Sequence, residues 1–378
     1  MRAYVYTDQS LERYAGRFVW LSINTEDAKN AAFLKRYPIP ALPTILILDP
    51  KGNVSSRYVG GATAPQVRKL LDEAESTHRS RTQTSADSLL VKADGLAAAG
   101  SHADAAKTYE EAMAGAPKHW SKYGRAAESL IFELSMANDD LRCATRALEL
   151  YSRVKGTASA ANVASTGLSC ATSIDKENAK RNELVSSLEK ATREVFDDAK
   201  IVLSDDDRSG LYIALIEARD ASGDDEGAVA LKAEWSAFLE GAAARAKTAE
   251  QRAVYDSHRL SAYLDLGTPE KAIPMLEQSE RDFPNDYNPP ARLALAYKAM
   301  KEYDQALAAS DRALVHVYGP RRLTVLSARA DIFLAKGDAK AARETIVQAV
   351  DYAKSLPEGQ RSERRIAGLE KRLASMQQ

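Results

Sequence analysis

Two cysteines and five histidines are the residues of this sequence with the most versatile chemistry. Cys143 and Cys170 are far apart in the chain, so neither belongs to a Cys-x-x-Cys pair. The histidines stand singly, at His78, His102, His119, His258 and His316. Zinc sites need clustered Cys and His ligands, so we expect no metal site. The sequence also lacks a glycine-rich phosphate loop, a Gly-x-Ser-x-Gly and a His-Glu-x-x-His, so we expect no cofactor.

The two cysteines could also form a disulfide bond with each other. The sequence predicts helices over 139–153 and 160–172, joined by a turn at Lys155-Gly156-Thr157. In an antiparallel pair Cys143 and Cys170 lie at roughly the same level, within reach of a disulfide. The alternative is two small buried thiols that pack between the helices. A disulfide would place the protein outside the cytosol.

Polar side chains along the last third of the chain form a second set of candidates. They lie on predicted helices, and a resemblance of these helices to a repeat family implies that they face a common groove: His258, Asn288, Arg292, Lys298 and Asp331. Such a row can bind a peptide, and its cationic members favour an anionic group. The alternative is an ordinary solvated helix surface.

These candidates depend on helix pairs that recur along the chain. The clearest pair spans 286–318, with Pro289-Pro290 in its first turn and a polar turn at Lys301-Glu302. Both of its helices are rich in alanine and need neighbours to bury their apolar faces. The turn residues Gly267, Lys301 and Gly337 follow one another at intervals of 34 and 36 residues (301−267 and 337−301).

The pairs resemble tetratricopeptide repeats. The first carries the pattern of small and aromatic residues at Ala93, Gly100, Ala105, Tyr109, Ala112 and Pro117. The resemblance implies an α-helical superhelix over 88–378 that binds a protein or peptide in its groove. Between Trp120 and Ser209 the spacing is lost, and 361–376 predicts a capping helix. The Lys and Asn set with which some members grip a terminal carboxylate is not reproduced.

The first 78 residues predict a small α/β domain. Strands are expected at 18–23, 44–48 and 54–59, and helices at 27–36 and 64–74.

The order of these elements, with Ala41-Leu42-Pro43-Thr44 before an apolar strand, resembles the thioredoxin fold. That resemblance implies a cis peptide bond before Pro43, with Leu42, Pro43 and Thr44 bordering a substrate groove. The first strand and the Cys-x-x-Cys of that family have no counterpart in the sequence. We therefore expect an incomplete, redox-inactive domain over 1–78 and a polar linker over 79–87.

The expected fold class is therefore α/β plus all-α: a partial thioredoxin-like domain followed by a helical superhelix. Fifty-two basic and 53 acidic residues give a net charge of −1, so no overall field favours nucleic acid. No apolar stretch is long enough to span a membrane.

The expected function is a scaffold for a protein partner, without catalysis. The alternative is a truncated form of an exported thiol–disulfide oxidoreductase whose Cys-x-x-Cys lies upstream of Met1. The location would be periplasmic or secreted if a signal peptide is missing upstream, and otherwise cytoplasmic.

Overall fold

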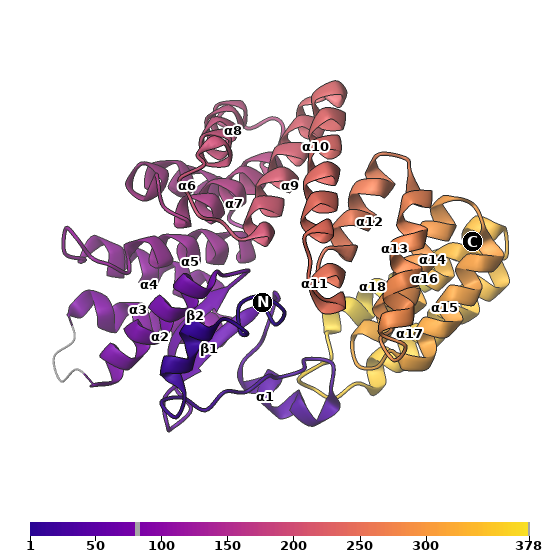
Figure 1. Cartoon of the computed structure of the whole chain (residues 1–378), viewed down its shortest axis with the longest axis horizontal. Helices are drawn as coiled ribbons and strands as arrows, with labels where there is room; N and C mark the ends of the chain where they lie inside the picture. Colours follow the sequence, from indigo (N-terminus) through magenta and orange to yellow (C-terminus); the bar gives the residue numbers. More distant parts are fainter. Residues whose placement is uncertain (80–83, 377–378) are drawn as a thin grey trace. The chain divides into compact units, whose positions relative to one another are not determined.

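A computed structural model describes residues 1–79 and 84–376 (Figure 1). The chain divides into two compact units, Met1–Phe18 with Ile39–Trp235, and Val19–Pro38 with Ser236–Gln378. This division does not coincide with the predicted domain boundary. Of the predicted linker 79–87, residues 80–83 lie outside the described residues, while Ser85 already begins a helix.

The first unit combines a small sheet with a series of helices. After a 3-10 helix, η1 (Gln9–Tyr14), the elements follow in this order: β1 (Thr44–Leu48), β2 (Val54–Val59), α2 (Ala64–Arg79), α3 (Ser85–Ala98), α4 (His102–Ala114), α5 (Tyr123–Met136), α6 (Asp140–Val154), α7 (Ser159–Ser173), α8 (Arg181–Asp197), α9 (Asp205–Ser222) and the first half of α10 (Asp225–Ala244).

The sheet consists of two antiparallel strands, β1 and β2, with Leu46 opposite Arg57 and an irregularity between Ile47 and Leu48. Its core contains Tyr14, Ile47 and Tyr58 with the apolar face of α2. The predicted strand at 18–23 was wrong. An apolar run becomes a buried strand only where neighbours satisfy its backbone groups, and these residues lie outside the sheet. The described sheet therefore has two strands and does not confirm the thioredoxin-like part of the prediction.

The peptide bond between Leu42 and Pro43 is cis, directly before β1. Strand β2 packs on helices α3 and α5 of the same unit. The side chains of Arg57 and Glu133 are fully buried at this contact, with Arg57 Nη1 2.7 Å from Glu133 Oε1.

The second unit is a run of helix pairs that also includes Val19–Pro38. Its elements are η2 (Ala28–Asn30), α1 (Ala31–Arg36), α11 (Ala249–Ala253), α12 (Asp256–Asp265), η3 (Pro269–Lys271), α13 (Ala272–Asp282), α14 (Asn288–Ala299), α15 (Tyr303–His316), α16 (Arg321–Lys336), α17 (Ala339–Ser355) and α18 (Glu363–Ser375), together with the end of α10. Helix α18 packs on α17 with Ile366 and Leu369, as expected of a capping helix.

The helix pairs form as their residues predict. Alanines lie where two helices of a pair cross, as at Ala294, Ala306 and Ala313, which are all buried. The turns within the last three pairs each hold a residue with positive φ, and Lys301 adopts 62° where Gly267 and Gly337 adopt 69° and 90°. The pairs continue through 120–209, where α5 packs on α6 and α7 on α8, although the sequence spacing is irregular there.

Candidate functional site

A pocket of about 150 Å³ lies between α14 and α16, the first helices of two successive pairs. We call it the α14–α16 pocket. Its lining comes from the start of α14, the facing side of α16 and one residue of α15: Tyr287, Asn288, Ala291, Arg292, Ala294, Leu295, Ser310, Arg321, Thr324, Val325 and Ala328. The lining combines alanine and aliphatic walls with a few polar groups.

Two polar groups of the pocket have no protein partner among the residues that the structure describes. The guanidinium of Arg292 forms no hydrogen bond and no ion pair within 1–79 and 84–376. The hydroxyl of Ser310 is buried without a hydrogen-bond partner in the same part of the chain. Both groups can donate a hydrogen bond to an incoming acceptor.

Two carboxylates and a second guanidinium act on the charge of Arg292. Burial lowers the pKa of Arg292, the negative charges of Asp256 and Asp286 oppose this effect, and the positive Arg321 adds a smaller lowering. The carboxylate of Asp286 is engaged by the amide of Asn288, whose Nδ2 donates to its Oδ1 at 2.7 Å. Burial, with Arg321 nearby, also lowers the pKa of Arg365.

Several hydrogen bonds hold the rim of the pocket in place. Arg365 Nη2 of α18 donates to Thr324 Oγ1 at 2.8 Å. The phenol of Tyr287 donates to Glu26 Oε1 at 3.0 Å, and Arg321 pairs with the same oxygen at 3.4 Å. Burial and the negative charge of Glu26 raise the pKa of Tyr287, so this phenol stays protonated as a donor.

The structure brings together two of the five predicted groove residues. Asn288 and Arg292 line the pocket, while His258 on α12 and Lys298 near the end of α14 lie outside it. Asp331 is engaged elsewhere, in an ion pair with Arg372 of α18.

The sequence analysis missed the residues that α16 contributes. The repeat period was the signal that could have found them, because a shift of 36 residues maps Asn288 onto Thr324 and Arg292 onto Ala328 (324−288 and 328−292). Arg321 lies within the first turn of the same helix.

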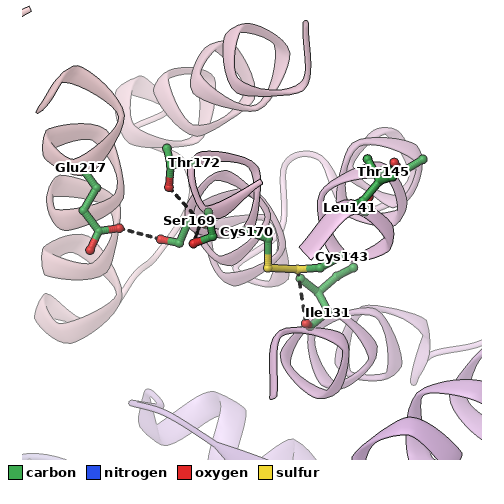
Figure 2. Close-up of a disulfide and its surroundings, with 9 residues drawn as sticks. Ile131, Leu141, Cys143, Thr145, Ser169, Cys170, Thr172 and Glu217 are labelled. Atoms are coloured by element: carbon green, nitrogen blue, oxygen red, sulfur yellow. Dashed lines mark hydrogen bonds between the residues drawn. A yellow bond between two sulfur atoms is a disulfide. The ribbon is translucent and has the colours of Figure 1, made fainter. Parts of the chain in front are cut away.

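The cysteine pair lies in the first unit, on α6 and α7 (Figure 2). The sulfur atoms of Cys143 and Cys170 are 2.08 Å apart, as in a disulfide, and both residues are buried. The helices α6 and α7 are antiparallel neighbours joined by a turn at Gly156, the arrangement that places the two residues at one level. No free thiol is found in the described chain.

The described residues contain no cluster of His, Cys, Asp and Glu that could hold a metal ion. Among the helices that the structure describes, none is long and apolar enough to cross a membrane.

Two solved structures are distantly similar to this chain. No family model matches the chain, and no curated protein matches it. A chain of the APC/C hetero-tetramer Cut9–Hcn1 is similar with a TM-score of 0.38 and 14% identity, over 82% of this chain and 55% of that one. A thermophilic tetratricopeptide repeat protein of Thermus thermophilus is similar with a TM-score of 0.27 and 18% identity, over 78% of this chain and 99% of that one.

Proposed function

We propose that the protein is an interaction scaffold of tetratricopeptide type, whose α14–α16 pocket binds a segment of a protein partner. The observation that carries this proposal is the hydroxyl of Ser310, which is buried in the pocket without a hydrogen-bond partner among the described residues, beside the half-buried guanidinium of Arg292. A buried donor without a partner costs about 1–3 kcal/mol, so a ligand that supplies an acceptor removes this cost.

The size of the pocket favours one side chain of a larger partner. Small-molecule sites usually measure about 300–1,000 Å³. The α14–α16 pocket, at about 150 Å³, is smaller than that. It suits a single anchoring side chain, while the rest of the partner segment lies along the exposed surface beside it, where Leu295 is 37% exposed.

The repeated helix pairs support a protein partner as well. Stacked pairs present their first helices side by side, and this creates an elongated surface on which an extended or helical segment can lie. Helices α14 and α16 are in contact in this way, each followed by its own second helix.

The oxidoreductase alternative has one feature of the described chain in its favour, the cis peptide bond before Pro43 that the thioredoxin resemblance implied. The sheet of the described chain has two strands, and the cysteines lie on helices α6 and α7, bonded to each other. A thiol–disulfide oxidoreductase attacks its substrate with a free thiolate.

Selection of peptides from a random displayed library against the full chain tests the proposal. We expect peptides whose affinity falls at least tenfold in Arg292→Glu, because the charge reversal places an anion where the pocket offers a donor. The matched control is Lys298→Glu on the same helix, outside the pocket, which should retain binding. Selected peptides that bind both variants as tightly as the unmodified chain would contradict the proposal.

A further inference from the structure

The segment Val19–Pro38, here called the strap, belongs to the second unit although it is distant from the rest of that unit in sequence. It contains η2 and the short helix α1, and its remainder is irregular. Contacts with three successive turns hold it, and each of these turns precedes the first helix of a pair or the capping helix α18.

At the first two turns the strap is bound by polar contacts. Glu26 accepts a hydrogen bond from Tyr287, the residue before α14, and pairs with Arg321 at the start of α16. Asn24 Nδ2 donates to the phenol oxygen of Tyr318 at 2.7 Å. Glu26 therefore contacts two residues that line the α14–α16 pocket, Tyr287 and Arg321.

At the third turn the contacts are similar in kind. Gln360 Nε2 donates to the backbone oxygen of Thr25 at 2.9 Å, and Lys35 Nζ lies 2.8 Å from Glu358 Oε2.

Two glycines permit the close approach of the strap. A Cβ at Gly319 would overlap the backbone oxygen of Glu26, and a Cβ at Gly359 would overlap that of Ala31. The Cβ at Gly359 would also lie 2.8 Å from the backbone nitrogen of Lys35. The turns are therefore fitted to the backbone of the strap.

The strap buries little apolar surface for its length. Of its 20 residues, all of them described, only Leu34 and Tyr37 are buried, while Val19 and Leu21 are 88% and 73% exposed. Elements with few buried apolar contacts open at low free-energy cost. The strap is therefore suited to exchange with another segment.

We infer that the strap competes with the partner for the rim of the α14–α16 pocket, and that the partner segment carries an acidic side chain which takes the place of Glu26. This inference rests on the proposed function and names the partner's chemistry. A partner carboxylate at this rim would accept the hydrogen bond from the Tyr287 hydroxyl and form the ion pair with Arg321, as Glu26 does now. The Arg292 charge, which has no ion-pair partner in the described chain, lies in the same pocket and adds to the attraction.

A fluorescent synthetic peptide with the sequence of residues 19–38, titrated into the full chain by anisotropy, tests the inference. The chain variant Glu26→Gln weakens the hold of the internal strap, so we expect it to bind the free peptide about tenfold more tightly than the unmodified chain. A peptide with Gln at position 26 should bind the same variant about tenfold more weakly than the natural peptide.

A matched glycine pair shows whether the free peptide occupies the strap's own place. In the Glu26→Gln chain, Gly359→Ala should abolish peptide binding through the clash with the peptide backbone. Gly368→Ala should leave binding intact, since a Cβ at Gly368 meets nothing within 4 Å.

Equal affinity of the free peptide for the Glu26→Gln and unmodified chains would overturn the inference, as would equal affinity of the two peptides. Library peptides that depend on Arg292 but bind no better to the Glu26→Gln chain would refute the inference alone and leave the scaffold proposal standing. Binding of the strap peptide as expected, without any Arg292-dependent library peptide, would instead refute the scaffold proposal.

Discussion

At the scale of single residues, the first unit depends on charges that are buried in pairs. Glu133 accepts a hydrogen bond from Arg57 at 2.7 Å, and its other oxygen lies 2.6 Å from Nδ1 of His102. Removal of one partner from a buried ion pair leaves the other charge unpaired, whereas replacement of both by apolar groups is often neutral.

Glu133→Leu should therefore destabilise the protein by about 3–5 kcal/mol, because the guanidinium of Arg57 stays buried without its carboxylate. The double variant Arg57→Met with Glu133→Leu should recover at least half of that loss. Urea unfolding followed by circular dichroism measures both. A double variant no more stable than Glu133→Leu would show that the unpaired charge is not the cause.

A second residue-scale prediction concerns Asp207, whose carboxyl forms a capping box with Ser204 at the start of α9. Burial raises the pKa of Asp207 to about 6. Between about pH 4 and 6 the folded state keeps this proton while the unfolded chain has lost it. The contribution of Asp207 to stability therefore falls as pH rises through this window, by about 3 kcal/mol in total.

Asp207→Asn removes this titration and keeps an oxygen that can accept from Ser204. Urea midpoints measured from pH 4 to 7 should fall less steeply for the variant than for the unmodified chain. Parallel pH profiles for the two proteins would show that Asp207 titrates alike in the folded and unfolded states.

At the scale of elements, local sequence decides the helix pairs, and non-local contacts decide the strap. The turn at Lys301 and the buried alanines on either side of it follow from local spacing, and the structure contains them as predicted. The apolar run at 18–23 has the composition of a strand but lies outside the sheet, with Val19 and Leu21 largely exposed. Asn24, directly after the run, instead contacts a turn almost 300 residues away. Sequence pattern alone does not contain that information.

The disulfide between Cys143 and Cys170 closes a loop with a sequence separation of 27. Loop entropy gives such a link about 3.5 kcal/mol of stabilisation. The double variant Cys143→Ser with Cys170→Ser should lose about this amount in urea unfolding.

Mass spectrometry after alkylation of the denatured chain tests whether the bond forms. Two alkyl groups should be added only after reduction. Alkylation of both sulfurs without reductant would contradict the bond. A formed disulfide is also typical of an oxidising compartment, so it would favour the periplasmic or secreted location over the cytoplasmic one.

The turn at Lys301 gives another prediction at this scale. Lys301 has a φ of 62°, a conformation that costs a residue with a Cβ about 1–2 kcal/mol and costs glycine little. Lys301→Gly should therefore raise the melting temperature. The opposite change, Gly337→Ala at the equivalent turn with φ 90°, should lower it. Changes of the same sign in both variants would contradict this account.

At the scale of the whole molecule, the chain's repeated helix pairs were predictable and the site was predictable in part. Asn288 and Arg292 could be found because they lie four residues apart on α14. The residues opposite them, Thr324 and Arg321, belong to the next pair. They could be found only by a shift of 36 residues from the pocket residues of α14. The contact of the strap with the rim of the pocket could not be predicted, because no motif or repeat period in the sequence links Glu26 to Tyr287.

The measurement that tests the central claim most directly is photo-crosslinking from the pocket. Benzoylphenylalanine placed at Leu295, which lines the α14–α16 pocket, should give a discrete protein adduct in the native host. The adduct should fall at least tenfold when Arg292→Glu is added. The same probe at Val315 on α15, 76% exposed and outside the pocket, should not give this adduct. Identical adducts from Leu295 and Val315, or an adduct indifferent to Arg292→Glu, would contradict the claim that the pocket binds a protein partner.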